Sequence, residues 1–395
     1  MTDLIIFETH PIQYRVPLYQ ELNKLIANKI KVVYASDFSV KGYLDKDFNT
    51  KFSWDIPLLS GYQYHILEGT SHSTNIEKWN GLPTKGIKEI ITKEKPKAIM
   101  LCSFSYKFSL VVLFYAISGR IPIWIRMETQ DIALNRGFIK GFLRNALYFL
   151  LYKFINKFFY IGKLNRNHYL THGVICEKLL PSVYSTLNSF ETVSQEDKYL
   201  IRRNIRIKYE ISENHFVILF SGKLITKKNP MLILKAVEKI LEQNHCPDIT
   251  CMFIGAGDLQ NELLKMSSEL EVRFNFKSIF TGFINQSEIQ NYYLASDAVV
   301  LPSKKMGETW GLVINEGLQA GNSAIISDAA GCSEDFKNLQ YVKIFKEGDV
   351  TDLADSIESI MNSGFRNTSF LNSIPNYSIA NSAKSIADEL NKLSA

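Results

Sequence analysis

Two glutamates, Glu308 and Glu316, stand eight residues apart in the segment ETWGLVINEGL, with Gly311 between them. A carboxylate is a pure acceptor, so a fixed pair of carboxylates suits the binding of hydroxyl groups on a ligand. The spacing, with a glycine inside it, is unusual for a surface helix, which scatters its acids. The pair therefore marks a candidate binding site.

The residues between the glutamates predict the start of a helix. If Pro302 ends a strand, residues 304–310 form a loop and a helix opens at Gly311. The first N–H groups of that helix, on Gly311, Leu312 and Val313, have no partner within the helix. The helix dipole favours an anion at this end. We therefore expect an anion-binding position between the two carboxylates.

A cationic segment, GKLITKKNP, follows an earlier strand of the same predicted sheet. Gly222 permits a tight exit from that strand. Lys223, Lys227 and Lys228 then place positive charge ahead of a helix that begins near Pro230. Cations next to helix N–H groups suit a phosphate, although a solvated basic loop would have the same composition.

The order carboxylate, anion site, carboxylate fits one class of ligand. A nucleotide-sugar presents ribose hydroxyls, a diphosphate and sugar hydroxyls in that order. The alternative is that Glu308 is a loop acid and that Glu316 is a helix acid favoured by the dipole. The lysine segment in the same predicted sheet favours the binding site.

The elements that carry these residues alternate between strand and helix. Apolar runs separated by helical periods predict parallel sheets with crossover helices. The fold class is therefore α/β, with two Rossmann-like doubly wound domains facing a central cleft. In the second half the expected strands are 215–221, 249–255, 278–283, 297–303, 323–327 and 341–345. Ligands of such sheets bind at the carboxyl ends of the strands.

We predict three parts in the chain. Residues 1–190 form an N-terminal domain on the acceptor side, and residues 191–372 form a C-terminal nucleotide-sugar-binding domain. Residues 373–395 form a last amphipathic helix that is able to cross back to the N-terminal domain. The polar residues 186–212 read as the linker and the entry to the second domain.

Bulk properties exclude several classes of protein. The net charge of +5 over 395 residues is weaker than nucleic-acid binding usually requires, so no nucleic-acid partner is expected. The five cysteines form no CxxC pair and read as reduced thiols. No run approaches the roughly 18 apolar residues of a membrane span, and the N-terminus lacks a secretory pattern. We expect a cytoplasmic protein.

The ordered motifs of the second half resemble the donor-binding half of family 4 retaining glycosyltransferases, which have the GT-B fold. The matching pieces are SGKLITKKNP, FIGAGDLQNEL, TGFINQSEIQNYYLASDAVVLPS, GETWGLVINEGLQAGNSAIIS and AGCSE, within residues 219–345. The N-terminal pieces THPIQYRVPLYQEL and FSWDIPLLSGY are similar to a bacterial branch of that family that builds cell-surface glycans.

The resemblance implies roles for individual residues. Lys223 and Lys228 would hold the donor diphosphate. Lys223 replaces the family's usual arginine, so it keeps the charge but loses the bidentate contact of a guanidinium group. Glu308 would face the donor sugar and Glu316 the ribose. The remaining donor-binding positions are Gly222, the main chain of Ile284, which would read the base, and the amides of Gly311, Leu312 and Val313.

The first half departs from the family pattern. ETHPIQYR stands in place of the glycine-rich loop after the first strand, and RMETQD replaces a segment that often carries a histidine. His10 and Glu128 are therefore the candidate catalytic residues on the acceptor side. A structural role for His10 is the alternative, because lone histidines after strands are more often structural.

The resemblance implies transfer of a sugar from a nucleotide-diphosphate-sugar donor to a glycan or lipid-linked acceptor, with retention at the anomeric carbon. No metal or other cofactor is expected, since lysines and helix amides would stabilise the leaving diphosphate. The one Asp-x-Asp, Asp45-Lys46-Asp47, reads as a solvated loop.

Three other functions remain open. One is a sugar-nucleotide epimerase or a phosphorylase of the same fold, and another is a non-catalytic nucleotide-sugar-binding partner. The third, a nicotinamide oxidoreductase, would need a complete glycine fingerprint, and Gly255-x-Gly257 lacks the third glycine.

Residues 132–176 contain seven bases and no acid, and they are rich in aromatic residues. Such a stretch is compatible with peripheral contact at the inner face of a membrane. However, Lys153 falls on the opposite side of a continuous helix from Arg144. We therefore predict a mostly buried helix of the first domain with basic ends.

Overall fold

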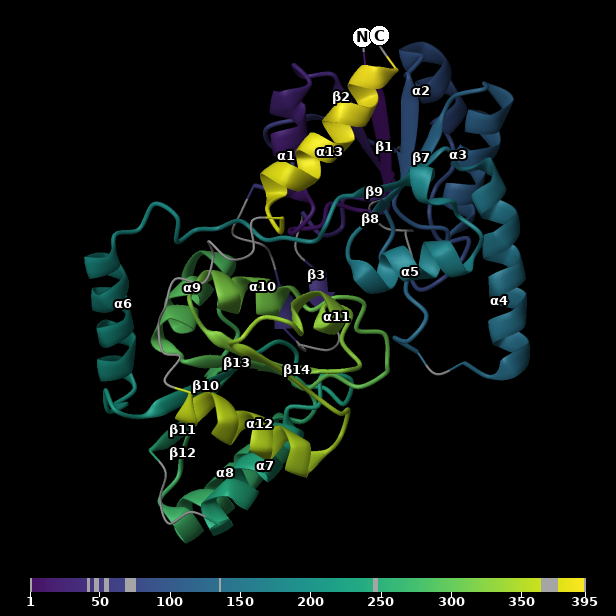
Figure 1. The fold of residues 1–395 in the computed structure, drawn as a ribbon. Helices are drawn as coiled ribbons and strands as arrows, with labels where there is room; N and C mark the ends of the chain where they lie inside the picture. The colour runs from purple at the N-terminus through teal and green to yellow at the C-terminus, as the bar shows by residue number, and fades with distance from the viewer. Residues whose placement is uncertain are drawn as a thin grey trace.

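The computed structural model describes residues 2–40, 43–45, 50–52, 57–67, 76–134, 136–243, 248–363 and 376–393. Two parallel sheets with helices on both faces form the two halves of the molecule (Figure 1). The predicted α/β fold class with two doubly wound domains is confirmed.

The N-terminal sheet has seven strands in the order β5-β2-β1-β6-β7-β8-β9. Its strands are β1 (Leu4–Glu8), β2 (Ile30–Tyr34), β5 (Gln63–Ile66), β6 (Ala98–Leu101), β7 (Ile123–Ile125), β8 (Lys157–Tyr160) and β9 (Leu179–Pro181). Its helices are α1 (Val16–Leu25), α2 (Ile87–Glu94), α3 (Lys107–Ser118), α4 (Phe138–Leu151) and α5 (Lys163–Thr171), with short 3-10 turns at η1 (Tyr152–Phe154) and η2 (Cys176–Lys178). A separate two-stranded sheet pairs β3 (Tyr43–Asp45) with β4 (Thr50–Phe52).

The C-terminal sheet has six strands in the order β12-β11-β10-β13-β14-β15. Its strands are β10 (Phe216–Ser221), β11 (Ile249–Ile254), β12 (Lys277–Gly282), β13 (Ala298–Leu301), β14 (Ser323–Ser327) and β15 (Val342–Phe345). Its helices are α6 (Gln195–Lys208), α7 (Met231–Gln243), α8 (Gln260–Phe274), α9 (Gln286–Ala295), α10 (Leu312–Gln319), α11 (Ser333–Phe336) and α12 (Val350–Asn362).

Both sheets are apolar on both faces, as parallel sheets covered by helices must be. Alternate residues of β10 enter two different cores: Val217 and Leu219 pack on one face, and Ile218 and Phe220 pack on the other. The strand order reverses between β10 and β13, where two crossovers run in opposite directions. Such a switch point leaves a crevice at the carboxyl ends of the two strands.

The last helix, α13 (Ile379–Lys392), lies against α1 of the N-terminal half (Figure 1). Its buried face, Ala383, Ile386, Ala387 and Leu390, joins the core between the N-terminal sheet and α1. The chain therefore crosses between the halves twice, once after β9 and once before α13. These two crossings and the packing of α13 tie the halves together.

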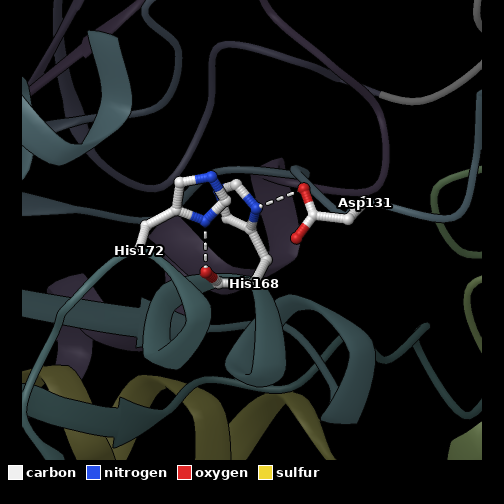
Figure 2. A group of neighbouring side chains, drawn as sticks. All are labelled: Asp131, His168 and His172. Atoms are coloured by element: carbon white, nitrogen blue, oxygen red, sulfur yellow. Dashed lines mark hydrogen bonds and ion pairs between the residues drawn. The ribbon is translucent and has the colours of Figure 1, made fainter. Parts of the chain in front are cut away.

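The expectation of a mostly buried helix in the basic, aromatic stretch is wrong. None of the residues of α4 is buried. The helix ends at Leu151, and Lys153 lies in the 3-10 turn η1, so 100° per residue does not apply beyond that point. α4 is instead held by polar contacts of Arg144 with Asp131 and of Asn145 with His172. Asp131 in turn contacts His168 (Figure 2).

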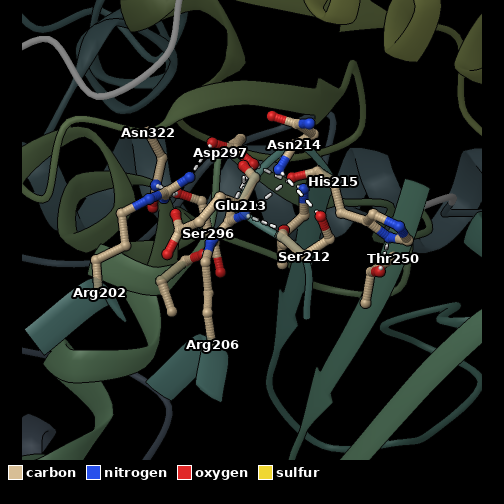
Figure 3. A network of polar contacts seen from close by, with 12 residues as sticks. Arg202, Arg206, Ser212, Glu213, Asn214, His215, Thr250, Ser296, Asp297 and Asn322 are labelled. Atoms are coloured by element: carbon tan, nitrogen blue, oxygen red, sulfur yellow. Dashed lines mark hydrogen bonds and ion pairs between the residues drawn. The ribbon is translucent and has the colours of Figure 1, made fainter. Parts of the chain in front are cut away.

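Residues 186–212, predicted as the linker and the entry to the second domain, contain α6, which packs on α9. Two arginines of α6, Arg202 and Arg206, reach the buried carboxylate of Asp297 at 2.8 Å each (Figure 3). The charges of these three residues are buried and paired, as buried charges must be. α6 is therefore part of the C-terminal half.

Candidate active site

A pocket of about 550 Å³ lies at the carboxyl end of the C-terminal sheet, between the two halves of the chain. Ten of the eleven candidate site residues line it: Gly222, Lys223, Lys228, Ile284, Glu308, Gly311, Leu312, Val313, Glu316 and Glu128. The first nine come from the C-terminal half. Glu128 faces them from the loop after β7, together with Gln13, Tyr14 and Tyr184.

The start of α10 forms one wall of the pocket. Gly311 is its N-cap residue, with φ +114°, and a Cβ placed on it would lie 2.3 Å from Leu301 Cδ2. Only glycine fits both the backbone angle and the space. The helix begins at Leu312, so its first amides point into the pocket, and no described residue accepts a hydrogen bond from the amides of Gly311, Leu312 or Val313. This is the geometry of an anion site.

Lys228 and Glu308 form an ion pair within the pocket. Lys228 Nζ donates to Glu308 Oε2 at 2.5 Å, and Ser303 Oγ donates to the same oxygen at 3.1 Å. Burial works to raise the pKa of Glu308, but the charge and hydrogen bond of Lys228 outweigh it and hold that pKa below its ordinary value. Glu308 is therefore an anion at neutral pH and Lys228 is its counter-ion.

Glu316 has a different environment. Gln286 Nε2 donates to its Oε1 at 3.1 Å and Tyr293 OH donates to its Oε2 at 2.7 Å. Both donors are neutral, so burial dominates and raises the pKa of Glu316 above its ordinary value. The two glutamates of the motif thus lie in one pocket, one paired with a cation and the other held by dipoles.

The loop after β10 supplies the other cations. Gly222, with φ +150°, turns the chain out of the sheet. Its carbonyl oxygen lies so close to the next loop that a Cβ on Gly255 would be 2.0 Å away from it. Lys223 and Lys227 line the pocket beside Lys228. The glycine at position 255 thus permits the close approach of the two backbones.

The N-terminal wall is a buried charged network. Arg15 Nη1 donates to both oxygens of Glu8 at 2.7 Å, and Arg15 Nη2 is paired with Glu128 Oε1. Tyr14 OH donates to the same Oε1 at 3.1 Å, and Tyr184 OH donates to it as well. Burial works to raise the pKa of Glu128, but the charge of Arg15 and these donors hold it below its ordinary value. Glu128 is therefore ionised and fixed.

His10 is the one candidate that does not line the pocket. Its ring packs against that of Phe38 in a tilted arrangement, with 4.5 Å between centroids, and its Nδ1 lies 2.9 Å from Thr9 Oγ1. Burial lowers the pKa of His10 to about 4, so the ring is neutral at physiological pH. The loop that carries it does reach the pocket, through Gln13 and Tyr14.

Several lining residues escaped the sequence analysis. Tyr14 and Tyr184 hold Glu128, and Gln286 holds Glu316. Gln286 follows β12 at the same sheet edge and could have been found from its position. The tyrosines carry no local signal, since Tyr184 reaches Glu128 only through the packing of the segment after β9.

A group with metal-ligand chemistry lies outside the pocket. The ligand atoms of Asp131, His168 and His172 lie within 4.8 Å of one another (Figure 2). Each ring nitrogen has a protein partner, however: His168 contacts Asp131 and Tyr152, and His172 contacts the His168 carbonyl and Asn145. We interpret the group as a structural contact. Of the Asp-x-Asp candidate, the side chain of Asp45 and the whole of Asp47 lie outside the described residues.

Comparison with known proteins gives a family match for part of the chain. Residues 201–374 match the model of the family described as Glycosyl transferases group 1. An uncharacterized glycosyltransferase of Methanocaldococcus jannaschii is 30% identical over 159 residues, which is 40% of this chain and 38% of that protein. The UDP-Gal:alpha-D-GlcNAc-diphosphoundecaprenol alpha-1,3-galactosyltransferase of Escherichia coli is 32% identical over 158 residues, 40% of this chain and 38% of that one. The chain thus spans about two fifths of the length of these curated relatives.

Solved structures extend the likeness to the whole chain. The Anabaena protein HepE, solved with UDP and glucose, has a TM-score of 0.69 at 16% identity, covering 99% of this chain and 100% of that one. A glycosyltransferase from Rickettsia africae has a TM-score of 0.71 at 15% identity, covering 100% and 99%. The chain therefore has the GT-B fold, and its residues 201–374 match the family Glycosyl transferases group 1.

Proposed function

We propose that this chain is a retaining glycosyltransferase that moves a sugar from a nucleotide-diphosphate-sugar to a glycan or lipid-linked acceptor in bacterial surface polysaccharide synthesis. One observation carries the proposal. The Lys228–Glu308 pair, the start of α10 and Glu316 line one pocket, and Glu128 faces them from the other half.

The donor would lie along the C-terminal wall. The diphosphate would be bound by the amides of Gly311, Leu312 and Val313 and by Lys228, which would turn from Glu308 towards the phosphate. Lys223 would add a further positive charge. Because these groups already neutralise a diphosphate, we propose that no metal ion is needed.

Both ends of the donor would meet a carboxylate. Glu316, held by Gln286 and Tyr293, would accept hydrogen bonds from the ribose hydroxyls. Glu308 would accept them from the donor sugar once Lys228 moves. The base would lie by Ile284, whose main chain offers it a donor and an acceptor.

The acceptor would meet Glu128. The three hydrogen bonds from Arg15, Tyr14 and Tyr184 all go to its Oε1. No described residue donates to Oε2, which is the oxygen left for an acceptor hydroxyl. Because its pKa is low, Glu128 would orient that hydroxyl through a hydrogen bond without removing its proton.

The proposed reaction follows a same-face route. The acceptor oxygen bonds to the anomeric carbon on the side from which the diphosphate departs, and the bond from that carbon to the phosphate oxygen breaks. The acceptor proton passes to the departing phosphate oxygen. Lys228 and the α10 amides stabilise the charge that develops on the diphosphate.

The test is a transfer assay on the purified protein with panels of UDP-, GDP- and dTDP-sugars and of glycan and lipid-linked acceptors. We expect one donor to yield a glycosylated product whose anomeric configuration, read by NMR, matches that of the donor. An inverted product would exclude retention. Formation of an epimerised nucleotide-sugar, or turnover that requires inorganic phosphate, would favour the epimerase or the phosphorylase instead.

A further inference from the structure

α4 is an amphipathic helix with its apolar side turned to solvent. Its less exposed positions, at spacings of three and four residues, form one face: Gly141, Arg144, Tyr148 and Leu151. The exposed apolar side chains are Phe138 (89%), Ile139 (73%), Phe142 (66%), Leu143 (62%), Leu147 (55%), Phe149 (50%) and Leu150 (56%). An ordinary surface helix has the reverse arrangement.

The exposed apolar residues form one continuous surface. At about 100° per residue they and Ala146 fall within one half of the helix, about 180° wide. Lys140 lies just outside one edge of that half, and Asn145 lies just outside the other. We call this half of the helix, residues 138–150, the apolar face. A single soluble domain rarely leaves so large an apolar patch exposed.

The apolar face is held outward by specific contacts on the inner face. Arg144 donates to Asp131 Oδ1 at 2.8 Å, and its guanidinium lies 4.7 Å from the ring centre of Tyr148. Asp131 in turn contacts His168 at 2.9 Å (Figure 2). His172 contacts Asn145 at 3.1 Å. Rotation of α4 to bury its apolar side would break this network.

Charge indicates what covers the apolar face. Residues 132–176 contain no acid, and Lys140 and Lys153 are exposed beside the face. Lys153 Nζ also lies 4.9 Å from the ring centre of Phe149. A second copy of this chain would bring like charges together. An anionic bilayer offers phosphates to the lysines and acyl chains to the apolar residues.

We propose that α4 docks the protein in the interface of a bilayer rich in anionic phospholipid. Its 14 residues are too few to cross the hydrocarbon core, which needs about 20, so the helix would lie in the plane of the headgroups. Within the described part of the chain no helix is long and apolar enough to span a membrane.

The position of α4 fits this role. It runs along the outer edge of the N-terminal half (Figure 1). The loop before it carries Glu128 at the pocket, and Arg144 contacts Asp131 of that same loop. A hollow of about 300 Å³ beside Phe149 is lined by Lys153 and Lys178 and offers two cations near the face. The proposal rests on these contacts and does not depend on the proposed sugar transfer.

The test is flotation of the full chain with lipid vesicles, made either of phosphatidylcholine alone or with about 30% phosphatidylglycerol. We expect the wild type to float with the anionic vesicles and much less with the neutral ones. The double variant Phe142→Glu/Leu147→Glu should reduce the bound fraction at least about tenfold. Lys140→Glu/Lys153→Glu should reduce binding to the anionic vesicles but not the weak binding to phosphatidylcholine vesicles.

The matched control is Leu264→Glu/Val272→Glu, which places two charges at exposed apolar positions of α8 in the other half (40% and 87% exposed). It should float like the wild type, and all variants should keep the wild-type melting temperature. Equal flotation of the wild type and Phe142→Glu/Leu147→Glu, or no flotation of the wild type, would overturn the proposal. So would a lipid-free dimer in sedimentation that Phe142→Glu/Leu147→Glu dissociates, because the face would then be a contact between copies.

Discussion

At the scale of residues, two charged groups of the pocket are paired with each other. Lys228 is paired with Glu308, so a diphosphate must compete with a carboxylate for it. That competition costs little if the sugar hydroxyls take over the vacated carboxylate, because both partners then remain hydrogen-bonded. Free diphosphate would leave the Glu308 carboxylate with the neutral hydrogen bond from Ser303 but without its cation. The pair thus favours the intact donor over its leaving group.

We predict that Glu308→Gln and Lys228→Met each lower kcat by more than about 100-fold, since both remove charge that acts on the reacting groups. Glu308→Gln keeps the shape of the side chain and its contacts to Lys228 and Ser303. The control is Lys277→Met, a partly exposed lysine on β12 that does not line the pocket. Steady-state kinetics on one donor measures the effect, and near wild-type rates in both pocket variants would refute the assigned roles.

A second prediction concerns Glu316, whose pKa burial raises above its ordinary value of about 4.5. The folded state then binds a proton more tightly than the unfolded state, so this group makes stability fall as pH rises from about 4.5 through its raised pKa. The free energy of unfolding is measured in urea from pH 4 to 7 for the wild type and for Glu316→Gln. The wild-type value minus the variant value should fall as the pH rises. A difference that does not change with pH would mean that the carboxylate is not desolvated.

The pocket residues of the C-terminal half could be predicted from the sequence, but not all of those of the N-terminal half. Glu308, Gly311 and Glu316 come from one short segment whose spacing depends only on one loop and one helix. His10 and Glu128 both follow strands of the N-terminal sheet, and no local sequence pattern shows which of them enters the pocket. Only the packing of Arg15 and Tyr184 places Glu128 in the pocket, while Phe38 holds His10 outside it.

At the scale of elements, periodic patterns predicted the strands well because parallel strands buried on both faces are nearly continuous apolar runs. The predicted strand 323–327 coincides with β14, and the run 249–255 exceeds β11 by one residue. The burial of α4 was predicted wrongly, because its apolar residues are exposed. No prediction was made for the side chains of α6, two of whose arginines are buried.

The buried arginines of α6 lead to a stability prediction. Arg206 is fully buried, is paired with Asp297 at 2.8 Å and donates to the carbonyl oxygens of Ala295 and Ser212 at 3.0 Å each (Figure 3). Arg206→Met removes one of the two arginines that pair with the buried Asp297, together with its hydrogen bonds to the two carbonyl oxygens, and should lower the free energy of unfolding by about 3 kcal/mol. Arg203→Met, at an exposed position on the same helix, should change it by less than about 0.5 kcal/mol.

Urea unfolding followed by circular dichroism measures both variants. Equal effects of Arg203→Met and Arg206→Met would mean that the contacts around Asp297 contribute nothing measurable to the fold.

At the scale of the whole molecule, the two halves meet along a polar seam beside the pocket. Gln130 Nε2 donates to the Glu308 carbonyl at 3.0 Å, and Asn315 Nδ2 donates to the Tyr184 carbonyl at 3.2 Å. Each bond joins a pocket residue of one half to the other half. The seam therefore fixes the position of Glu128 relative to Glu308, and it sets the geometry between the proposed acceptor and donor.

Gly162 offers a way to disturb this seam alone. A Cβ at this position would lie 2.1 Å from Trp310 Cζ3, and Trp310 is buried. We predict that Gly162→Ala separates the halves, raises the radius of gyration in solution scattering and lowers kcat about tenfold or more through misalignment. Gly141→Ala, which meets nothing within 4 Å, is the control, and a Gly162→Ala protein that is as compact and active as Gly141→Ala would contradict the prediction.

The central claim is that the pocket binds a nucleoside diphosphate through the loop after β10 and the start of α10. Hydrogen–deuterium exchange measured by mass spectrometry with UDP, GDP, ADP and dTDP tests it most directly. The account predicts that at least one of them slows exchange in peptides covering residues 221–229 and 308–318, and that Lys228→Met weakens this protection. Protection confined to other segments, or none with any nucleotide at millimolar concentration, would contradict it.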